Sequence, residues 1–200
     1  MMLAIGMGEL DRDALRRCKQ HDPIAMRAFV VHYQSSVFAL LSRLLGKTHP
    51  YLEDVAQEVF VRAYRAFPGF DLDRDARAST WLLTIATRLA LNERKRRVFA
   101  ALPIDAKREP PAPTTPETER SRRELGRAIE AAAATLSADQ RAVFVLAEYH
   151  GWSVAAMARA LEIPENTAKT RLFRAREKMR ALLLSWSSNG GASEANDDRG

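Results

Sequence analysis

The chain has 200 residues, enough for one or two small domains, and its 31 lysines and arginines against 25 acidic residues give a net charge of +6. This balance favours polyanionic partners, and the single cysteine excludes an internal disulfide. No apolar run approaches the roughly 20 residues of a membrane helix. We therefore expect a cytoplasmic protein without membrane insertion. Cys18 and His21 have ligand-like spacing, but no second pair follows, so we predict no metal site and no cofactor.

The first predicted domain, residues 11–97, reads as three helices. An aspartate-proline pair starts the first, 22–46, whose apolar residues keep to one face until a glycine ends it. A second amphipathic helix covers 52–67 and stops at a proline-glycine pair. After a polar loop at 70–79, a third helix runs over 80–97 and ends in four consecutive cations.

A proline-rich segment separates this domain from a second one. Five of the nine prolines lie between residues 102 and 118, which predicts an extended linker over 98–116. The second domain, 117–184, contains a capping box at 137–140 that starts a helix. The small polar residues of 185–200 predict a disordered tail.

The end of the second domain has the pattern of a helix-turn-helix. Ser153 is placed to cap a short helix, and Pro164 suits the first turn of the next helix, 165–184. Small or apolar residues recur along one stripe of that last helix: Ala168, Leu172, Ala175, Met179, Leu182 and Leu183. Residues 164–180 also hold six basic and two acidic side chains, which is typical of a helix that enters the DNA major groove.

These patterns predict an all-α fold: two small helical domains joined by the linker, the second containing the helix-turn-helix. Enzymatic readings find little support. Gly46-Lys47-Thr48 matches the end of a phosphate-binding loop, but Leu41 holds the position of the required upstream glycine and no strand precedes it. We therefore predict that the chain is not an enzyme and has no catalytic residues.

Two segments of the first domain have both an ordinary and a functional interpretation. Asp54, Gln57 and Glu58 share one exposed helix face, which is either a solvated acidic surface or a docking surface for a basic partner. The cations at 94–97 exceed what compensation of the helix dipole requires, which favours a nearby polyanion. Trp81 is more typical of a core than of a base-stacking platform.

Three segments together resemble the extracytoplasmic function (ECF) sigma factors, the two-domain class of bacterial RNA polymerase sigma subunits. They are Asp-Val-Ala-Gln-Glu-Val-Phe at 54–60, Thr-Trp-Leu-Leu-Thr-Ile-Ala at 80–86 with its basic end, and the region from Leu136 through Arg176. The resemblance covers about residues 11–184 in the expected order. Glu162 and Asn166 depart from it, because the family often has glycine at these positions.

The resemblance implies roles for the first domain. Asp54, Gln57 and Glu58 would bind the clamp coiled coil of the largest subunit of core RNA polymerase. The loop at 70–79 and the helix after it would recognise and melt the −10 promoter element, with an unstacked base held by the loop. The predicted −10 contacts are Trp81, Thr84, Arg88, Asn92, Arg94, Lys95, Arg96 and Arg97.

The second domain would read the −35 element through its last helix. The predicted contacts are Lys169, Thr170, Arg171, Phe173, Arg174 and Lys178, of which Phe173 either meets a thymine methyl group or packs inside. The family implies control by an anti-sigma factor. A stand-alone operator-binding regulator and a helical adaptor without affinity for nucleic acid remain the alternatives.

Overall fold

The computed structural model describes residues 8–73, 77–100, 126 and 128–189, and no strand occurs among them. The predicted all-α class is therefore confirmed. The helices of the N-terminal unit are α1 (Arg12–Lys19), α2 (Pro23–Leu45), α3 (Leu52–Ala66), the 3-10 turn η1 (Phe67–Gly69) and α4 (Ala78–Ala100). Those of the C-terminal unit are α6 (Ala138–Glu148), α7 (Val154–Leu161) and α8 (Glu165–Asn189). Residues 128–134 are also helical.

Local capping explains where α2 begins and ends. The Asp22 carboxylate accepts hydrogen bonds from the backbone N–H groups of Ile24 and Ala25, both at 2.9 Å. These bonds, led by that from Ala25, lower the pKa of Asp22. At the other end the backbone turns at Gly46, whose φ of 104° is a conformation that glycine adopts readily.

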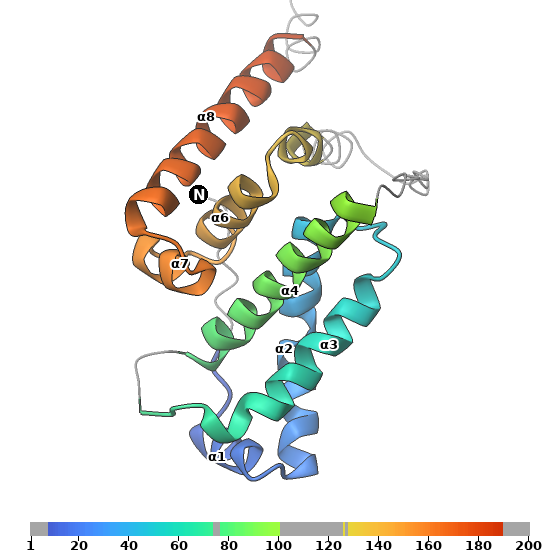
Figure 1. The fold of residues 1–200 in the computed structure, drawn as a ribbon, viewed down its shortest axis with the longest axis vertical. Coiled ribbons are helices and arrows are strands. Elements are labelled where there is room, and N and C mark those ends of the chain that lie inside the picture. Colours follow the sequence, from blue (N-terminus) through green and yellow to red (C-terminus); the bar gives the residue numbers. More distant parts are fainter. Residues whose placement is uncertain (1–7, 74–76, 101–125, 127, 190–200) are drawn as a thin grey trace, which may run out of the picture.

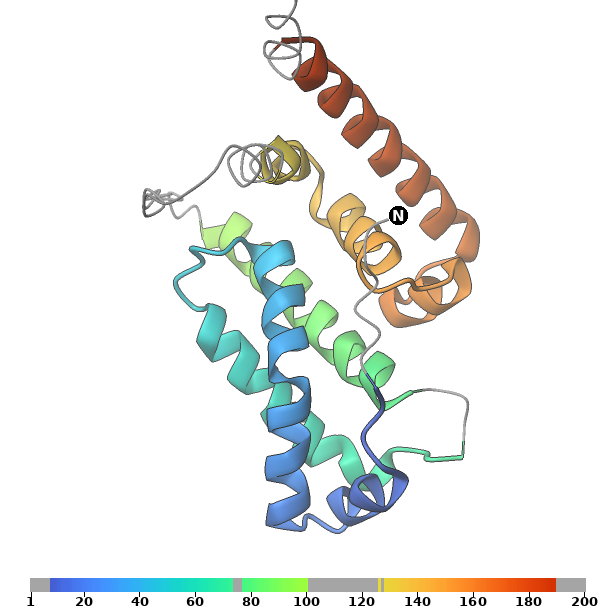
Figure 2. The same ribbon diagram turned by 180° about the vertical axis from the view of Figure 1, so that it is seen from behind.

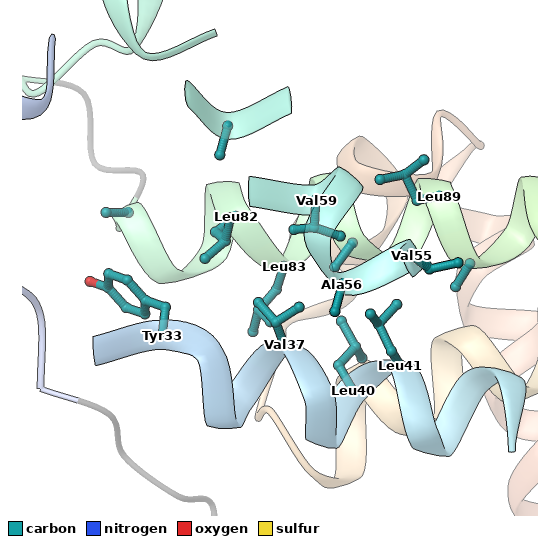
Figure 3. Packing of buried hydrophobic residues seen from close by; sticks show 14 of the residues in the cluster. Tyr33, Val37, Leu40, Leu41, Val55, Ala56, Val59, Leu82, Leu83 and Leu89 are labelled. Carbon is teal, nitrogen blue, oxygen red and sulfur yellow. The ribbon is translucent and has the colours of Figure 1, made fainter. Parts of the chain in front are cut away.

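The core of the N-terminal unit lies between α2, α3 and α4, and Figure 3 shows their side chains meeting there. Leu40 and Leu41 of α2 lie opposite Val55 and Ala56 of α3, and all four are buried, as is Leu82 of α4 farther along the bundle. Such burial contributes about 1.5–3 kcal/mol for each large aliphatic side chain. The apolar stripes read from the sequence are thus the faces that pack.

The expectation that no apolar run approaches the length of a membrane helix is wrong for α2. Among the described residues, it is the helix that is long and apolar enough to cross a membrane, with a mean hydropathy of 1.3 over its most apolar window. Its residues are apolar for a different reason: α2 is the central helix and contacts α1, α3, α4 and α6. Its inner face carries eight buried residues of the core.

In the C-terminal unit, α6 begins with the predicted capping box. The Ser137 hydroxyl accepts the backbone N–H of Gln140, and the Gln140 side chain accepts the backbone N–H of Ser137. The Ser153 hydroxyl accepts the backbone N–H of Ala156 and so caps the short helix α7. Between α7 and α8, Glu162 takes the left-handed conformation, with φ 55° and ψ 45°. A non-glycine residue therefore makes the turn that the family often assigns to glycine.

One helix and two helix ends differ from the sequence predictions. Helix α1 was not predicted, because its eight residues give too short a periodic pattern. Helix α4 continues to Ala100, so the first three residues of the predicted linker 98–116 are helical, and most of that linker lies outside the described residues. Helix α8 continues to Asn189, so 185–189 are not part of a disordered tail.

The two units lie against each other. Helices α2 and α4 both contact α6, and α4 also contacts α7. Figures 1 and 2 show α7 and α6 beside α4 while α8 lies on the outer side, away from α2 and α3. Buried residues of both units belong to one continuous apolar cluster, to which the C-terminal unit contributes Val143, Leu146 and Met157.

Candidate functional site

The acidic face of α3 borders a cleft between α3 and α4. Asp54 and Gln57 are exposed, and the partly buried Glu58 forms an ion pair of 2.7 Å with Arg62 one turn later. The cleft has a volume of about 380 Å³. Its lining combines two of the three predicted polymerase-binding residues, without Gln57, with residues of the distal half of α4: Tyr51, Asp54, Val55, Glu58, Arg62, Leu89, Asn92, Glu93 and Arg96.

The cleft therefore brings together two sets of residues that the sequence analysis treats separately. Asp54 and Glu58 come from the predicted polymerase-binding set, whereas Asn92 and Arg96 come from the predicted −10 set. Arg96 also pairs with Glu93 at 3.2 Å. Carboxylates and cations side by side suit a partner that presents both charges, such as a basic helix next to a nucleic acid.

The first part of α4 is more buried than a DNA-binding surface. Trp81 is half-buried and packs on two aromatic rings, with centroids 5.1 Å from Phe67 and 4.8 Å from Phe70. This supports its interpretation as a core residue. The Thr84 hydroxyl donates to the Thr80 carbonyl at 2.8 Å, as threonines inside helices commonly do.

Two arginines of the predicted −10 set are engaged within the protein. Arg88 donates to the Ala160 carbonyl at 2.8 Å and pairs with Glu162 at 3.0 Å, so it binds the end of α7. Arg94 donates to the Leu44 carbonyl at 3.1 Å, and burial lowers its pKa. Neither position could be inferred from spacing along α4.

The remaining cations of α4 point outwards. Lys95 and Arg96 are exposed, and Asn92 is exposed beside them. The side chain of Arg97 lies outside the described residues. Of the predicted −10 contacts, Asn92, Lys95 and Arg96 are exposed in this conformation, and Arg88 keeps 46% of its side chain exposed beside its contacts with α7.

Helix α8 presents one continuous exposed face. On this face lie two pairs of exposed residues, each pair one helical turn apart: Lys169 with Phe173, and Thr170 with Arg174. Phe173 is 64% exposed, which decides between the two alternatives of the sequence analysis: its ring does not pack inside. The Thr170 hydroxyl donates to the Asn166 carbonyl at 2.8 Å. An exposed aromatic ring among cations suits contact with nucleic-acid bases.

Two other predicted −35 residues face α6 instead. Arg171 forms an ion pair with Asp139 at 2.8 Å, and its side chain is 30% exposed. Lys178 donates to the side chain of Gln140 at 3.3 Å. These contacts tie α8 to the beginning of α6 and leave fewer donors for bases.

Sequence reasoning missed three residues that bear on this site. Asp139 of α6 and Glu162, which follows α7, are partners of predicted DNA-binding arginines but belong to other parts of the chain. Glu9 accepts the backbone N–H of Ala78 at 3.0 Å and the hydroxyl of Ser79 at 2.5 Å, which caps α4 from a segment far away in sequence. No pattern near α4 could identify that cap, because it spans about seventy residues of chain.

Comparisons with known families match the two units separately. The family described as Sigma-70 region 2 matches residues 29–99, and that described as Sigma-70, region 4 matches residues 126–179. The chain is 32% identical to the ECF RNA polymerase sigma factor SigW of Bacillus subtilis, over 84% of this chain and 94% of that protein. It is 28% identical to the RNA polymerase sigma-H factor of Pseudomonas aeruginosa, over 88% of this chain and 94% of that one.

Solved structures show the same fold. CnrH in complex with the cytosolic domain of CnrY has a TM-score of 0.61 and 25% identity, covering 88% of this chain and 97% of CnrH. RpoE of Bartonella quintana, in complex with the anti-sigma factor NepR, has a TM-score of 0.60 and 23% identity, covering 79% of this chain and 96% of that one.

Proposed function

The chain belongs to the extracytoplasmic function class of the sigma-70 family, and from this premise we propose how its helices divide the work of promoter recognition. As an RNA polymerase sigma factor it acts in transcription initiation. The N-terminal unit binds core polymerase and the −10 element, and the C-terminal unit binds the −35 element. The observation that carries the proposal is the exposed face of α8, where Phe173 stands among cations.

For the −35 element, Lys169, Phe173 and Arg174 make the base and phosphate contacts. An arginine can hold guanine through two hydrogen bonds, with about 1–3 kcal/mol of discrimination for each good pair. Arg171 has a second role beside the predicted contact with DNA: its ion pair with Asp139 orients α8 on α6. Its loss should therefore affect the position of α8 as well as any contact with DNA.

For core polymerase, the cleft between α3 and α4 is the docking surface. Asp54, Gln57 and Glu58 meet the clamp coiled coil of the largest subunit, and the adjacent Asn92, Lys95 and Arg96 meet −10 DNA. Because Asp54 and Glu58 line the same cleft as Asn92 and Arg96, binding of polymerase places the DNA-binding cations of α4 beside the strand that melts. The loop before α4 would hold an unstacked base, which costs a few kcal/mol.

The partners follow from the family. Core RNA polymerase and promoter DNA are the working partners, and an anti-sigma factor restrains the protein, as the anti-sigma factor NepR binds the sigma factor RpoE in one of the similar structures. Sigma factors are non-enzymatic initiation factors, and we propose that this chain carries out no chemistry itself. Its place of action is the cytoplasm, where polymerase and DNA are found.

Run-off transcription with purified core polymerase tests the proposal. The chain should add a promoter-specific transcript that core polymerase alone does not make. A gel shift with and without core polymerase separates the alternatives: an operator-binding regulator binds duplex DNA tightly by itself, and a helical adaptor binds none. Either result would overturn the proposal.

Two matched variants of α8 test the assignment of its face. Arg174→Ala removes an exposed cation of the DNA-binding face and should weaken promoter binding by the holoenzyme about tenfold, in line with the loss of one good contact. Arg180→Ala removes a cation that pairs with Glu177 nearer the end of the helix, and it should leave binding near the wild-type value. Equal losses would show that α8 contributes only diffuse charge.

A further inference from the structure

The loop before α4 is bound on both sides by the first described residues of the chain. On the side that leads into α4, one carboxylate oxygen of Glu9 accepts the backbone N–H of Ala78 at 3.0 Å, and the other accepts the Ser79 hydroxyl at 2.5 Å. Figures 1 and 2 show the segment before α1 running past this end of α4. The start of α4 is therefore fixed by a carboxylate that lies 69 residues earlier in the chain.

The other side of the loop is bound by α1. The Arg12 guanidinium donates to the Leu72 carbonyl at 2.8 Å and forms an ion pair with Asp73 at 2.6 Å. The Lys19 ammonium donates to the Phe70 carbonyl at 2.7 Å. Because two of these three acceptors are backbone carbonyls, the contacts fix the path of the main chain and not only one side chain.

Helix α1 is anchored to the core, so it can support the loop. Leu15 and Cys18 are buried in the apolar cluster of the N-terminal unit, and α1 contacts both α2 and η1. Glu9 is also held from below, because the hydroxyl of the buried Tyr33 donates to it at 3.3 Å. Burial, and to a lesser extent the charge of Glu9, raise the pKa of Tyr33 to about 12, so this hydroxyl keeps its proton at neutral pH.

Both sides of the loop are connected to Trp81, the first residue of the predicted −10 set. Phe70 is buried, and its ring centroid lies 4.8 Å from that of Trp81. The backbone N–H of Trp81 donates to the Arg77 carbonyl at 3.0 Å in the first turn of α4. Lys19 thus binds the residue on which Trp81 packs, and Glu9 binds the helical turn that carries Trp81.

Residues 8–19 lie before the Sigma-70 region 2 match, which begins at residue 29. We propose that Glu9, Arg12 and Lys19 are positioning residues for the −10 element: they fix both sides of the loop and so shape the place where an unstacked base is held. This inference rests on the proposed function, in which the loop holds that base. A preformed site avoids the cost of ordering the loop when the base binds, which favours DNA with bases over the bare backbone.

The test measures how much affinity the bases contribute. Holoenzyme made from core polymerase and the chain is titrated with short fluorescent single strands of uniform dA, dT or dC, and with an abasic strand of the same length and charge. Core polymerase alone gives the background. The ratio of the highest base-bearing affinity to the abasic affinity isolates the contribution of the bases, because a loss of charge or of active protein lowers both affinities alike.

Arg12 and Arg16 provide a matched pair of variants. Both are arginines of α1, with side chains 59% and 61% exposed, but Arg16 pairs with Asp13 of its own helix and not with the loop. Arg12→Ala should lower the ratio about two- to fivefold, the range that an exposed ion pair with a further hydrogen bond can supply. Arg16→Ala should leave the ratio at the wild-type value, and Arg12→Lys, which keeps a cationic donor, should restore part of it.

Glu9→Ala removes the acceptor at the start of α4 and should lower the ratio about fivefold, as expected for the loss of a helix cap. An unchanged ratio in both Glu9→Ala and Arg12→Ala would overturn the inference and leave the proposed function standing. An equal fall of the ratio in Arg12→Ala and Arg16→Ala would do the same. A wild-type ratio near one would instead contradict the role of the loop in holding a base, and both proposals for the −10 element would fall together.

Discussion

His150 provides a sharp test of the packing between the two units. Its Nε2 atom is buried without a hydrogen-bond partner among the described residues. Burial, and secondarily the charge of Arg43, lower the pKa of His150 from 6.5 to about 4. The ring is therefore neutral in the folded chain over a range of pH in which the unfolded chain already binds a proton.

The sign and size of the effect follow from this gap. As the pH falls below 6.5, His150 binds a proton in the unfolded state but not in the folded state. The free energy of unfolding therefore decreases until the pH reaches about 4, where the folded state also binds the proton. The full gap corresponds to about 3 kcal/mol, and most of it is lost by pH 4.5. In a chain of this size that loss corresponds to a fall of roughly 6–12 °C in Tm.

The assay compares urea unfolding at pH 7.5 and pH 4.5 for the wild type and for His150→Gln, whose side chain does not titrate. The variant should lose about 2–3 kcal/mol less than the wild type between the two pH values. Arg43→Gln should reduce the wild-type loss by a smaller amount, because Arg43 is the lesser cause. Equal losses in the wild type and His150→Gln would refute the reasoning.

Three further predictions test the fold. Leu40→Ala should lower the free energy of unfolding by about 2–5 kcal/mol, because it opens a cavity among α2, α3 and α4. Ile24→Ala, at an exposed position, should change it by less than about 0.5 kcal/mol, and urea unfolding measures both. Ser137→Ala removes half of the capping box and should cost about 1 kcal/mol, and Thr at this position should restore most of it. Glu9→Ala should speed hydrogen exchange at the start of α4, while the amides in the middle of α4 keep their wild-type rates. Uniform exchange along α4 in the last variant would show that Glu9 is not its cap.

Local chemistry explains why so much of the fold could be predicted. The caps at Asp22, Ser137 and Ser153 join groups only two or three residues apart. Both donor and acceptor therefore lie within one short sequence pattern, which makes these caps predictable. The apolar stripes of α3 and α8 repeat at helical spacing for the same reason. The family resemblance added the roles, and the region 2 and region 4 matches support the same family.

The candidate site was less predictable, because exposure along a helix depends on what packs against it. The sequence predicts Arg88, Arg94 and Arg171 as outward cations, yet their partners lie 32 or more residues away in sequence. Phe173 shows the reverse: its apolar side chain suits a core, but the stripe that packs on α6 leaves it on the outer face.

The sequence by itself determined the longer helices, the local caps at Asp22, Ser137 and Ser153, the class of fold and the family, because each depends on patterns within a few turns of chain. Only the tertiary structure decided which cations remain available for DNA. Whether a guanidinium meets solvent, a carboxylate or the end of another helix depends on how α7 and α6 dock on α4. That docking is set by apolar contacts between residues far apart in sequence, which no periodicity records.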